Sequence, residues 1–371
     1  MENTQQLKPI PWGDQGNVTD ASRTTHQIVE FDFLRTVAIL LLFLHHGGIY
    51  NFSVFSLSLE IFKPYIEQLL LGSFVFMAGY LSVNSLEKST LVGFFRRRLF
   101  RVYLPYLVAL ILFVLILDLD VTRLDLVIHL IGAQMLLSPE FTEPILTLWY
   151  VGLILTFYII FGSLYKSFKS PLYLAIAVVL IFAITYTLRL EWGIIGRRFF
   201  YFFFIFATGI LCAKTRKLRV LTTDRYFFID KLLLLLFGIF FYGVYADENE
   251  FPLFLPRLLA MDIYILAAVI TILSFARLYR KYLSNIWLIS IISYSAFFAY
   301  LLHRPIWKAL LSVYTPPTEQ LTALYQILFG SAVVVVLSFV LQKTYNRFST
   351  RLMDRQTLAT PHKPDSSYSA R

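Results

Sequence analysis

The sequence has few charged residues and almost no cysteine. Charged side chains make up 15% of the 371 residues and hydrophobic side chains 58%, whereas soluble domains contain about 25% charged residues. This composition excludes an ordinary soluble domain and predicts an integral membrane protein with several spans. The single cysteine, Cys212, excludes an internal disulfide.

Acidic residues are also scarce relative to basic ones, which gives a formal net charge of +10. Most of the basic residues lie in short segments between apolar runs, which is the pattern of membrane topology rather than of nucleic-acid binding. We therefore expect the lipid bilayer as a partner and no nucleic acid. We also expect no metal site and no permanently bound cofactor.

Long apolar runs dominate the rest of the chain. A helix needs about 20 apolar residues to cross the hydrocarbon core, and ten runs qualify, so we predict an all-α polytopic protein of about ten spans. The stretch "LVIHLIGAQMLL" is too short to cross and is expected to be interfacial or re-entrant. The predicted spans are 31–50, 64–84, 99–117, 144–164, 172–190, 199–213, 231–246, 255–275, 286–310 and 321–342.

Alternate loops differ sharply in Lys and Arg, whereas two of the intervening loops carry the acidic runs "DLD" and "DENE". The positive-inside rule then places both termini in the cytoplasm. Residues 1–27 are polar without the apolar core of a signal peptide, and we expect a flexible tail there. We expect a transmembrane domain over 28–343 and a basic flexible tail over 344–371. No internal repeat of the secondary-transporter kind is evident.

The first span, "FDFLRTVAILLLFLHHGGIY", carries four ionisable groups that are costly in a bilayer. Arg35 and His46 are eleven residues apart, or about three helical turns and 16 Å, so both project from one face. Asp32 lies one turn before Arg35, near a surface that we expect to solvate both charges. His45 points about 100° away. The stripe suits proton transfer by His46, but the charges could instead anchor the helix while the histidines bond to neighbouring helices.

The third span begins with "FFRRRLFRVYLPYL". Arg98 and Arg101 lie one turn apart, Arg97 and Arg101 also share a face, and arginine suits bidentate binding of phosphate. The alternative is a topological stop that pairs with anionic lipid headgroups. Arg101 fits this alternative less well, because it lies inside the apolar run.

Two further stretches carry candidate residues. In "SYSAFFAYLLHRPIW", His303 is either a second functional imidazole or an interfacial residue beside a proline kink. In "TLWYVGLILTFYIIF", Trp149 and Tyr150 are expected in the aromatic belt at the outer interface. The small residues of "LLGSFVFMAGYLS", Gly72 and Gly79 among them, are expected to permit close helix approach.

In this order, the stretches resemble the membrane-bound acyltransferase family 3 over residues 28–343. The family pattern of an arginine, ten residues and a histidine falls on Arg35 and His46. The late "S-x-x-x-Y-L-x-H-x-P" pattern points to His303. Ala78, Thr156 and Phe33 depart from the usual residues. The other matching segments are "FVFMAGYL", "LWYVGLILTFYIIF" and "RRRLFRVYLPYL" with Arg98, Arg101, Pro105 and Tyr106.

The resemblance implies an O-acyltransferase of the plasma membrane, bacterial inner membrane in type, without a fused hydrolase-like domain. Such an enzyme moves an acyl group, acetyl in the simplest case, from cytoplasmic acyl-CoA to a hydroxyl of a cell-surface or exported carbohydrate or glycolipid. An exporter of a polysaccharide or glycolipid, or an assembly protein without chemistry, is the alternative. The acyl group, the acceptor and the oligomeric state stay open.

The resemblance also suggests roles for individual residues. His46 would act with Arg35 at the catalytic centre, as general base or as transient nucleophile. The donor phosphates would meet Arg35 and a basic group made of Arg97, Arg98 and Arg101. Supporting roles would fall to Asp32 beside Arg35, His303 on the acceptor side, and Tyr106 and His45, of which His45 is the expected bystander.

Overall fold

The structure, a computed structural model, describes residues 29–54, 57–222, 228–245 and 254–358. The chain is an all-α polytopic membrane protein, with one small hairpin of strands β1 (Ser53–Val54) and β2 (Leu57–Ser58) after the first helix. The helices are α1 Val29–His46, α2 Lys63–Glu87, α3 Leu91–Arg98, α4 Leu104–Leu117, α5 Arg123–Leu130, α6 Gln134–Leu137, α7 Trp149–Ser167, α8 Pro171–Trp192, α9 Arg197–Thr215, α10 Leu218–Thr222, α11 Phe228–Tyr245, α12 Phe254–Leu278, α13 Arg280–Leu283, α14 Trp287–Val313, α15 Glu319–Leu324 and α16 Ser331–Leu358. Short 3-10 segments occupy η1 Ile49–Asn51, η2 Leu59–Phe62 and η4 Leu146–Leu148, and π-helical segments occupy η3 Leu99–Tyr103 and η5 Tyr325–Gly330.

In the described part of the chain, eight helical segments are long and apolar enough to cross a membrane. They match eight of the predicted spans, including the sixth and seventh. The first and ninth predicted spans correspond to α1 and α14, which are less uniformly apolar because they carry the candidate site residues. The eight segments are Leu59–Glu87, Leu91–Leu117, Leu146–Ser167, Pro171–Trp192, Arg197–Thr215, Phe228–Tyr245, Phe254–Leu278 and Glu319–Arg351.

Helix α1 lies inside the bundle and packs against α2, α12 and α14. Its buried face includes Leu34, Ile39 and Leu42, each fully buried. By contrast, α8 and α11 lie at the edge of the bundle and expose rows of large apolar side chains. Because lipid tails are as apolar as these side chains, such faces are suited to contact with the bilayer.

Helices α2 and α9 approach each other closely through two glycines. A Cβ atom on Gly79 would lie 2.3 Å from the carbonyl oxygen of Phe206, and one on Gly209 would lie 2.4 Å from that of Phe76. No larger side chain fits at either position without moving a backbone. The close approach expected at Gly79 is therefore confirmed.

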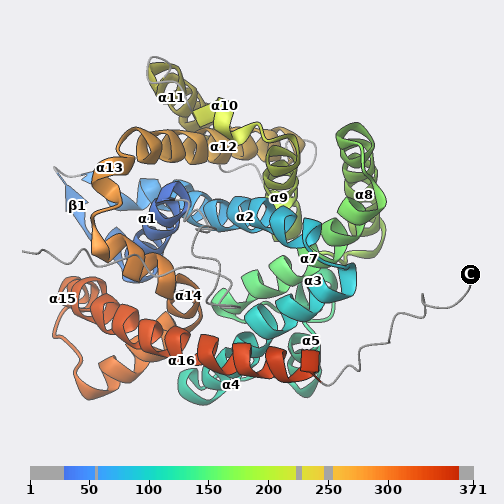
Figure 1. Ribbon diagram of the computed structural model, residues 1–371. Coiled ribbons are helices and arrows are strands. Elements are labelled where there is room, and N and C mark those ends of the chain that lie inside the picture. Colours follow the sequence, from blue (N-terminus) through green and yellow to red (C-terminus); the bar gives the residue numbers. More distant parts are fainter. Residues whose placement is uncertain (1–28, 55–56, 223–227, 246–253, 359–371) are drawn as a thin grey trace, which may run out of the picture.

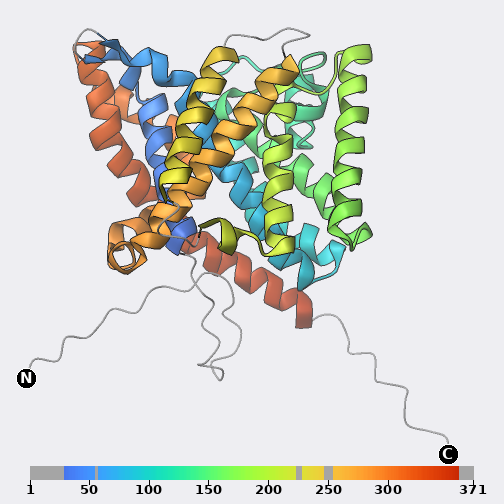
Figure 2. The same cartoon turned by 90° about the horizontal axis from the view of Figure 1, so that it is seen from above.

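Both described ends of the bundle lie on one side. Helix α1 begins, and α16 ends, at the lower side of the bundle in Figure 2. We call this the inner side and the opposite one the outer side. The arrangement agrees with an even number of crossings, while the assignment of the inner side to the cytoplasm stays a prediction.

The short stretch after α4 folds back alongside it. The Tyr103 hydroxyl donates to the carbonyl of Leu130 at the end of α5, and the Tyr106 hydroxyl donates to the carbonyl of His129 at 2.9 Å. Helix α5 thus reaches the first turn of α4 rather than crossing the bundle. Of the two expectations for this stretch, the re-entrant one fits.

Helix α16 continues to Leu358, past the domain boundary predicted at residue 343. Its continuation packs on the bundle: the Asn346 Nδ2 donates to the Tyr294 hydroxyl at 3.0 Å, and the Tyr345 hydroxyl donates to the carbonyl of Phe100. The predicted tail is thus helical as far as Leu358, and Tyr345 and Asn346 at its start pack on the bundle. The predicted tails 1–27 and 359–371 lie outside the described residues.

Candidate functional site

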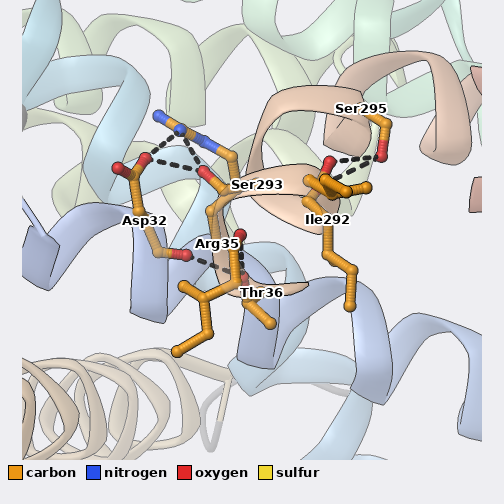
Figure 3. A network of polar contacts seen from close by, with 8 residues as sticks. Asp32, Arg35, Thr36, Ile292, Ser293 and Ser295 are labelled. Atoms are coloured by element: carbon orange, nitrogen blue, oxygen red, sulfur yellow. Dashed lines mark hydrogen bonds and ion pairs between the residues drawn. The ribbon is translucent and has the colours of Figure 1, made fainter. Parts of the chain in front are cut away.

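Four polar side chains on α1 and α14 form a closed cluster on the inner side, which we call the inner cluster (Figure 3). Arg35 Nη1 lies 3.1 Å from Asp32 Oδ1 and 2.8 Å from Ser293 Oγ, and the Ser293 hydroxyl donates to the same Asp32 oxygen at 2.7 Å. The Thr36 hydroxyl bonds the carbonyls of Asp32 and Ile289. Asp32 thus contacts Arg35 directly, which is compatible with the supporting role expected of it.

The expectation that interfacial water solvates these charges is wrong. Only 10% of the Asp32 side chain and 20% of the Arg35 side chain are exposed. The tertiary structure covers this end of α1 with α14, so each charge is stabilised by its partner and by Ser293 instead of by solvent. A buried charge requires such pairing.

At the other end of the same helix pair, His46, His303 and Arg304 form the outer cluster. The imidazoles of His46 and His303 stack with ring centroids 5.2 Å apart and planes inclined by 18°. Arg304 Nη2 lies 3.1 Å from His46 Nδ1. Helix α1 ends at His46 because Gly48 turns the chain with a left-handed φ of 85°, which leaves the imidazole at the mouth of the bundle.

The hydrogen-bond partners determine which nitrogens carry hydrogen. A carbonyl only accepts, so His303 Nδ1, 2.8 Å from the carbonyl of Tyr300, carries a hydrogen, and in the neutral ring His303 Nε2 has the lone pair. A guanidinium only donates, so His46 Nδ1 accepts from Arg304. His303 Nε2 is buried without a hydrogen-bond partner. In the outer cluster, the lone pair of His46 Nδ1 therefore accepts a hydrogen bond, whereas the lone pair of His303 Nε2 accepts none.

The inner and outer clusters lie on parallel helices with the same offset. Arg35 contacts Ser293, and His46 contacts Arg304, in each case 258 positions later in the sequence. Both side chains on α1 therefore face α14. The prediction that Arg35 and His46 share one face of their helix is confirmed.

His46 borders a cavity of about 710 Å³ at the outer ends of the helices, which we call the outer cavity. Leu42, His45 and His46 come from the end of α1, and Glu67, Leu70 and Leu71 from the start of α2. The remaining lining residues are Met135, Ser138, Pro139, Glu143, Pro144, Leu146, Thr147, Trp149, Arg189, Gly196, Arg197, Arg198, Tyr300 and Arg304. A small substrate can thus reach His46 from the outer side, while His303 is fully buried behind it.

His45 lies closer to this site than its angular position on the helix suggested. Its ring centroid is 4.6 Å from that of His46, it lines the same cavity, and its Nδ1 lies 2.8 Å from the Tyr50 hydroxyl. Unlike His46, it makes its hydrogen bond within the segment after α1 rather than with α14. The expectation that it is a bystander stays a prediction.

The arginines before α4 do not share one environment. Arg98 is half-buried, with its guanidinium 4.9 Å from the ring centroid of Phe94 and 4.4 Å from that of Tyr158. Arg97 bonds Ser85 and Ser89 on and after α2. Arg101 is exposed. Arg101 lies in the π-helical segment η3, which begins directly after Arg98, and the wider turn of η3 changes the register that an α-helix would give.

Two expected roles find little support in the placement of the residues. Tyr106 is fully buried and bonds His129 and Gln134, which ties the α5–α6 segment to the first turn of α4. Trp149 and Tyr150, expected in an interfacial belt, are 6% and 7% exposed. The belt assignment is therefore wrong: the α5–α6 segment and neighbouring helices cover this end of α7, and Tyr150 packs on Tyr300 with ring centroids 5.1 Å apart.

Several site residues were not identified from the sequence. Arg304 follows His303 directly, but its contact with His46 depends on how α14 packs. Arg197 and Arg198 lie in the predicted outer loop between the fifth and sixth spans, and Arg189 lies at the end of the fifth span; all three line the outer cavity. Basic residues on the outer side conflict with the positive-inside rule. This conflict could have identified these arginines as candidate site residues from the sequence.

A family model described as an acyltransferase domain matches residues 28–343. This is the range over which the motifs of the sequence resemble acyltransferase family 3, and it includes both clusters and the outer cavity. No curated protein and no solved structure gives a significant match.

Proposed function

Because the chain belongs to acyltransferase family 3, we propose that this membrane acyltransferase transfers an acyl group, acetyl in the simplest case, from acyl-CoA to a hydroxyl of a carbohydrate or glycolipid. The observation that carries the proposal is the outer cluster: two stacked imidazoles, one of which faces the outer cavity. An acceptor that is exported or displayed at the cell surface can enter from that side. The plasma membrane, of bacterial inner-membrane type, is the membrane that we propose.

The proposed reaction needs a base for the acceptor hydroxyl. The hydroxyl oxygen attacks the thioester carbonyl, its proton passes to an imidazole nitrogen, and the carbon–sulfur bond breaks. The imidazolium then returns the proton to the departing thiolate, which leaves as the free thiol of CoA. We assign the base to His46, because it lines the cavity whereas His303 is fully buried.

The contact with Arg304 places a condition on this assignment. While Arg304 donates to His46 Nδ1, that lone pair cannot accept a proton. We propose that Arg304 turns from His46 to the bound acceptor before the hydroxyl reacts. His303, stacked on His46, holds the plane of the ring and is therefore a positioning residue for the base.

We propose that the donor enters from the inner side, taken as the cytoplasm. Arg97, Arg98 and Arg101 supply the cationic groups that CoA phosphates require, and Arg35 supports them from within the inner cluster. Arg98 is the best placed of the three for a role inside the bundle, because it is half-buried against Tyr158. The thioester would then extend toward His46 past Tyr150 and Tyr300.

The test measures acyl transfer in membranes that contain the protein. Mass spectrometry of surface glycans, with and without the gene, should find an added acyl mass that depends on the protein and disappears in His46→Ala. Acceptor that accumulates outside the membrane without any covalent change would contradict the proposal and favour an exporter.

A further inference from the structure

The outer cavity has an excess of positive charge. Four arginines, Arg189, Arg197, Arg198 and Arg304, line it together with two carboxylates, Glu67 and Glu143. Within the described part of the chain, none of these arginines lies within 4.0 Å of a carboxylate oxygen; the ion pair found there is Arg35–Asp32. The cavity therefore holds more cationic than anionic side chains, and none of its four arginines is held in a close ion pair with a described carboxylate.

Neutral groups hold three of these arginines in place. Arg189 Nη1 donates to the carbonyl of Ile195 at 2.6 Å, and the Arg198 guanidinium lies 4.4 Å from the ring centroid of Trp149. Arg304 is held by His46, while its Nε is buried without a partner. Since each guanidinium has five N–H donors, each keeps several that can bind a ligand.

The N-terminus of helix α9 adds positive electrostatic potential to the cavity. Helix α9 begins at Arg197, and its N-cap residue, Gly196, lines the outer cavity with no side-chain cap. The first N–H groups of a helix have no partner within the helix, and its dipole favours an anion there. The four arginines and the start of α9 thus line the same cavity.

We propose that the outer cavity binds an anionic group, a phosphate or a carboxylate, of the acyl acceptor. The identification of the ligand as the acyl acceptor rests on the proposed acyltransferase function, whereas the anion-binding site itself does not depend on that function. It assigns the acceptor to acidic sugars or to phosphate-bearing glycans and glycolipids rather than to neutral sugars.

The site also links acceptor binding to the base. Arg304 lines the outer cavity and also donates to His46 Nδ1. An anion in the cavity competes with His46 for the donors of Arg304. Binding of the acidic acceptor therefore frees the lone pair of His46 at the moment when the hydroxyl arrives, and a neutral sugar leaves that lone pair occupied.

Trp149 offers a direct readout, because Arg198 lies on its ring. The full-length protein in nanodiscs of phosphatidylcholine is titrated with glucose 1-phosphate, glucuronate and glucose while tryptophan fluorescence is recorded. We expect saturable changes with the phosphate or the carboxylate and none with glucose. Trp149→Phe should remove the change, which assigns the signal to this ring.

Arginine variants then locate the site. Arg198→Gln and Arg197→Gln should each weaken binding roughly tenfold, the size of one charge-assisted contact. Because Arg198→Gln also alters the surroundings of Trp149, Arg197→Gln gives the cleaner result. Arg123→Gln is the matched control: Arg123 is an exposed arginine at the start of α5 and does not line the cavity. Its binding curve should be unchanged.

Different results separate the possible sources of the anion. A fluorescence change in nanodiscs that contain phosphatidylglycerol, but none with glucose 1-phosphate or glucuronate, would assign the site to a lipid headgroup and overturn the acceptor proposal. A response to CoA alone, lost in Arg197→Gln, would assign it to the donor and overturn it as well. Equal responses to glucose and glucose 1-phosphate, or no response to any anion, would refute the anion site itself.

Failure of this inference can be distinguished from failure of the proposed function. Acyl transfer to a neutral glycan that is unaffected by Arg197→Gln would overturn the anion site and leave the acyltransferase intact. Anion binding in the outer cavity without any acyl transfer would overturn the acyltransferase function and leave the anion site intact.

Discussion

Both ends of the α1–α14 pair carry ionisable groups, but the two ends arrange them differently. In the inner cluster, Asp32, Arg35 and Ser293 bond one another in a closed set. In the outer cluster, His303 Nε2 and Arg304 Nε have no partner, and His46 borders a cavity. A closed set suits a structural role because its members satisfy one another, whereas groups left open beside a cavity are available to a substrate.

The largest expected effect separates the two clusters by activity. His46→Ala should lower acyl transfer by on the order of 10²–10⁴-fold, the usual contribution of a general base, with normal protein levels in the membrane. The measurement is transfer of a labelled acyl group by isolated membranes. His45→Ala, its neighbour in the same cavity, is the control and should be far milder; equal losses would refute the assignment of the base to His46.

For stability the order of the two clusters should be reversed: a variant in the inner cluster should lower the stability of the protein more than a variant in the outer cluster. Asp32→Asn leaves the largely buried Arg35 without its carboxylate and should lower the free energy of unfolding by about 3 kcal/mol. His46→Ala removes no charge partner from a buried set, so its melting temperature should stay close to wild type. Unfolding of both variants in one detergent tests this. If His46→Ala were the less stable protein, the distinction between closed and open clusters would fail.

A packing defect away from both clusters provides a reference for these changes in stability. Gly79→Ala places a methyl group against the backbone of Phe206 and should cost about 1–3 kcal/mol, as overpacking does. Gly93→Ala is the control, since its Cβ would lie no closer than 3.2 Å to the Thr90 hydroxyl. Chemical denaturation of both variants should show a loss for Gly79→Ala that exceeds the loss for Gly93→Ala, and acyl transfer per folded molecule should remain. A similar loss in both would show that α2 and α9 can move apart.

The smallest effect concerns the donor at the inner side. Arg98→Ala and Arg101→Ala should each raise KM for acyl-CoA roughly tenfold, the size expected for one charged contact, with little change in KM for the acceptor. Initial rates against both substrates provide the test. Lys166→Ala, another basic residue on the inner side, is the control. If KM for acyl-CoA stayed constant, the donor phosphates would have to bind elsewhere.

Much of the fold was predictable because membrane spans have strong signals. In the described part of the chain, each of the eight helical segments that are long and apolar enough to cross a membrane matches a predicted span, and the phase of Arg35 and His46 follows from helix geometry alone. The solvation of Asp32 and the interfacial place of Trp149 were predicted wrongly for a shared reason. Both residues lie near the ends of apolar runs, and hydropathy cannot show whether another segment covers such an end.

The sequence by itself determined the helical membrane architecture, the family and the common face of Arg35 and His46, since these depend on local composition, spacing and order. Only the tertiary structure decided what that face meets. Ser293 and Arg304 follow Arg35 and His46 by 258 positions, and Arg198 reaches the same cavity from another helix. Such contacts depend on how helices distant in sequence pack, and no local pattern records that packing.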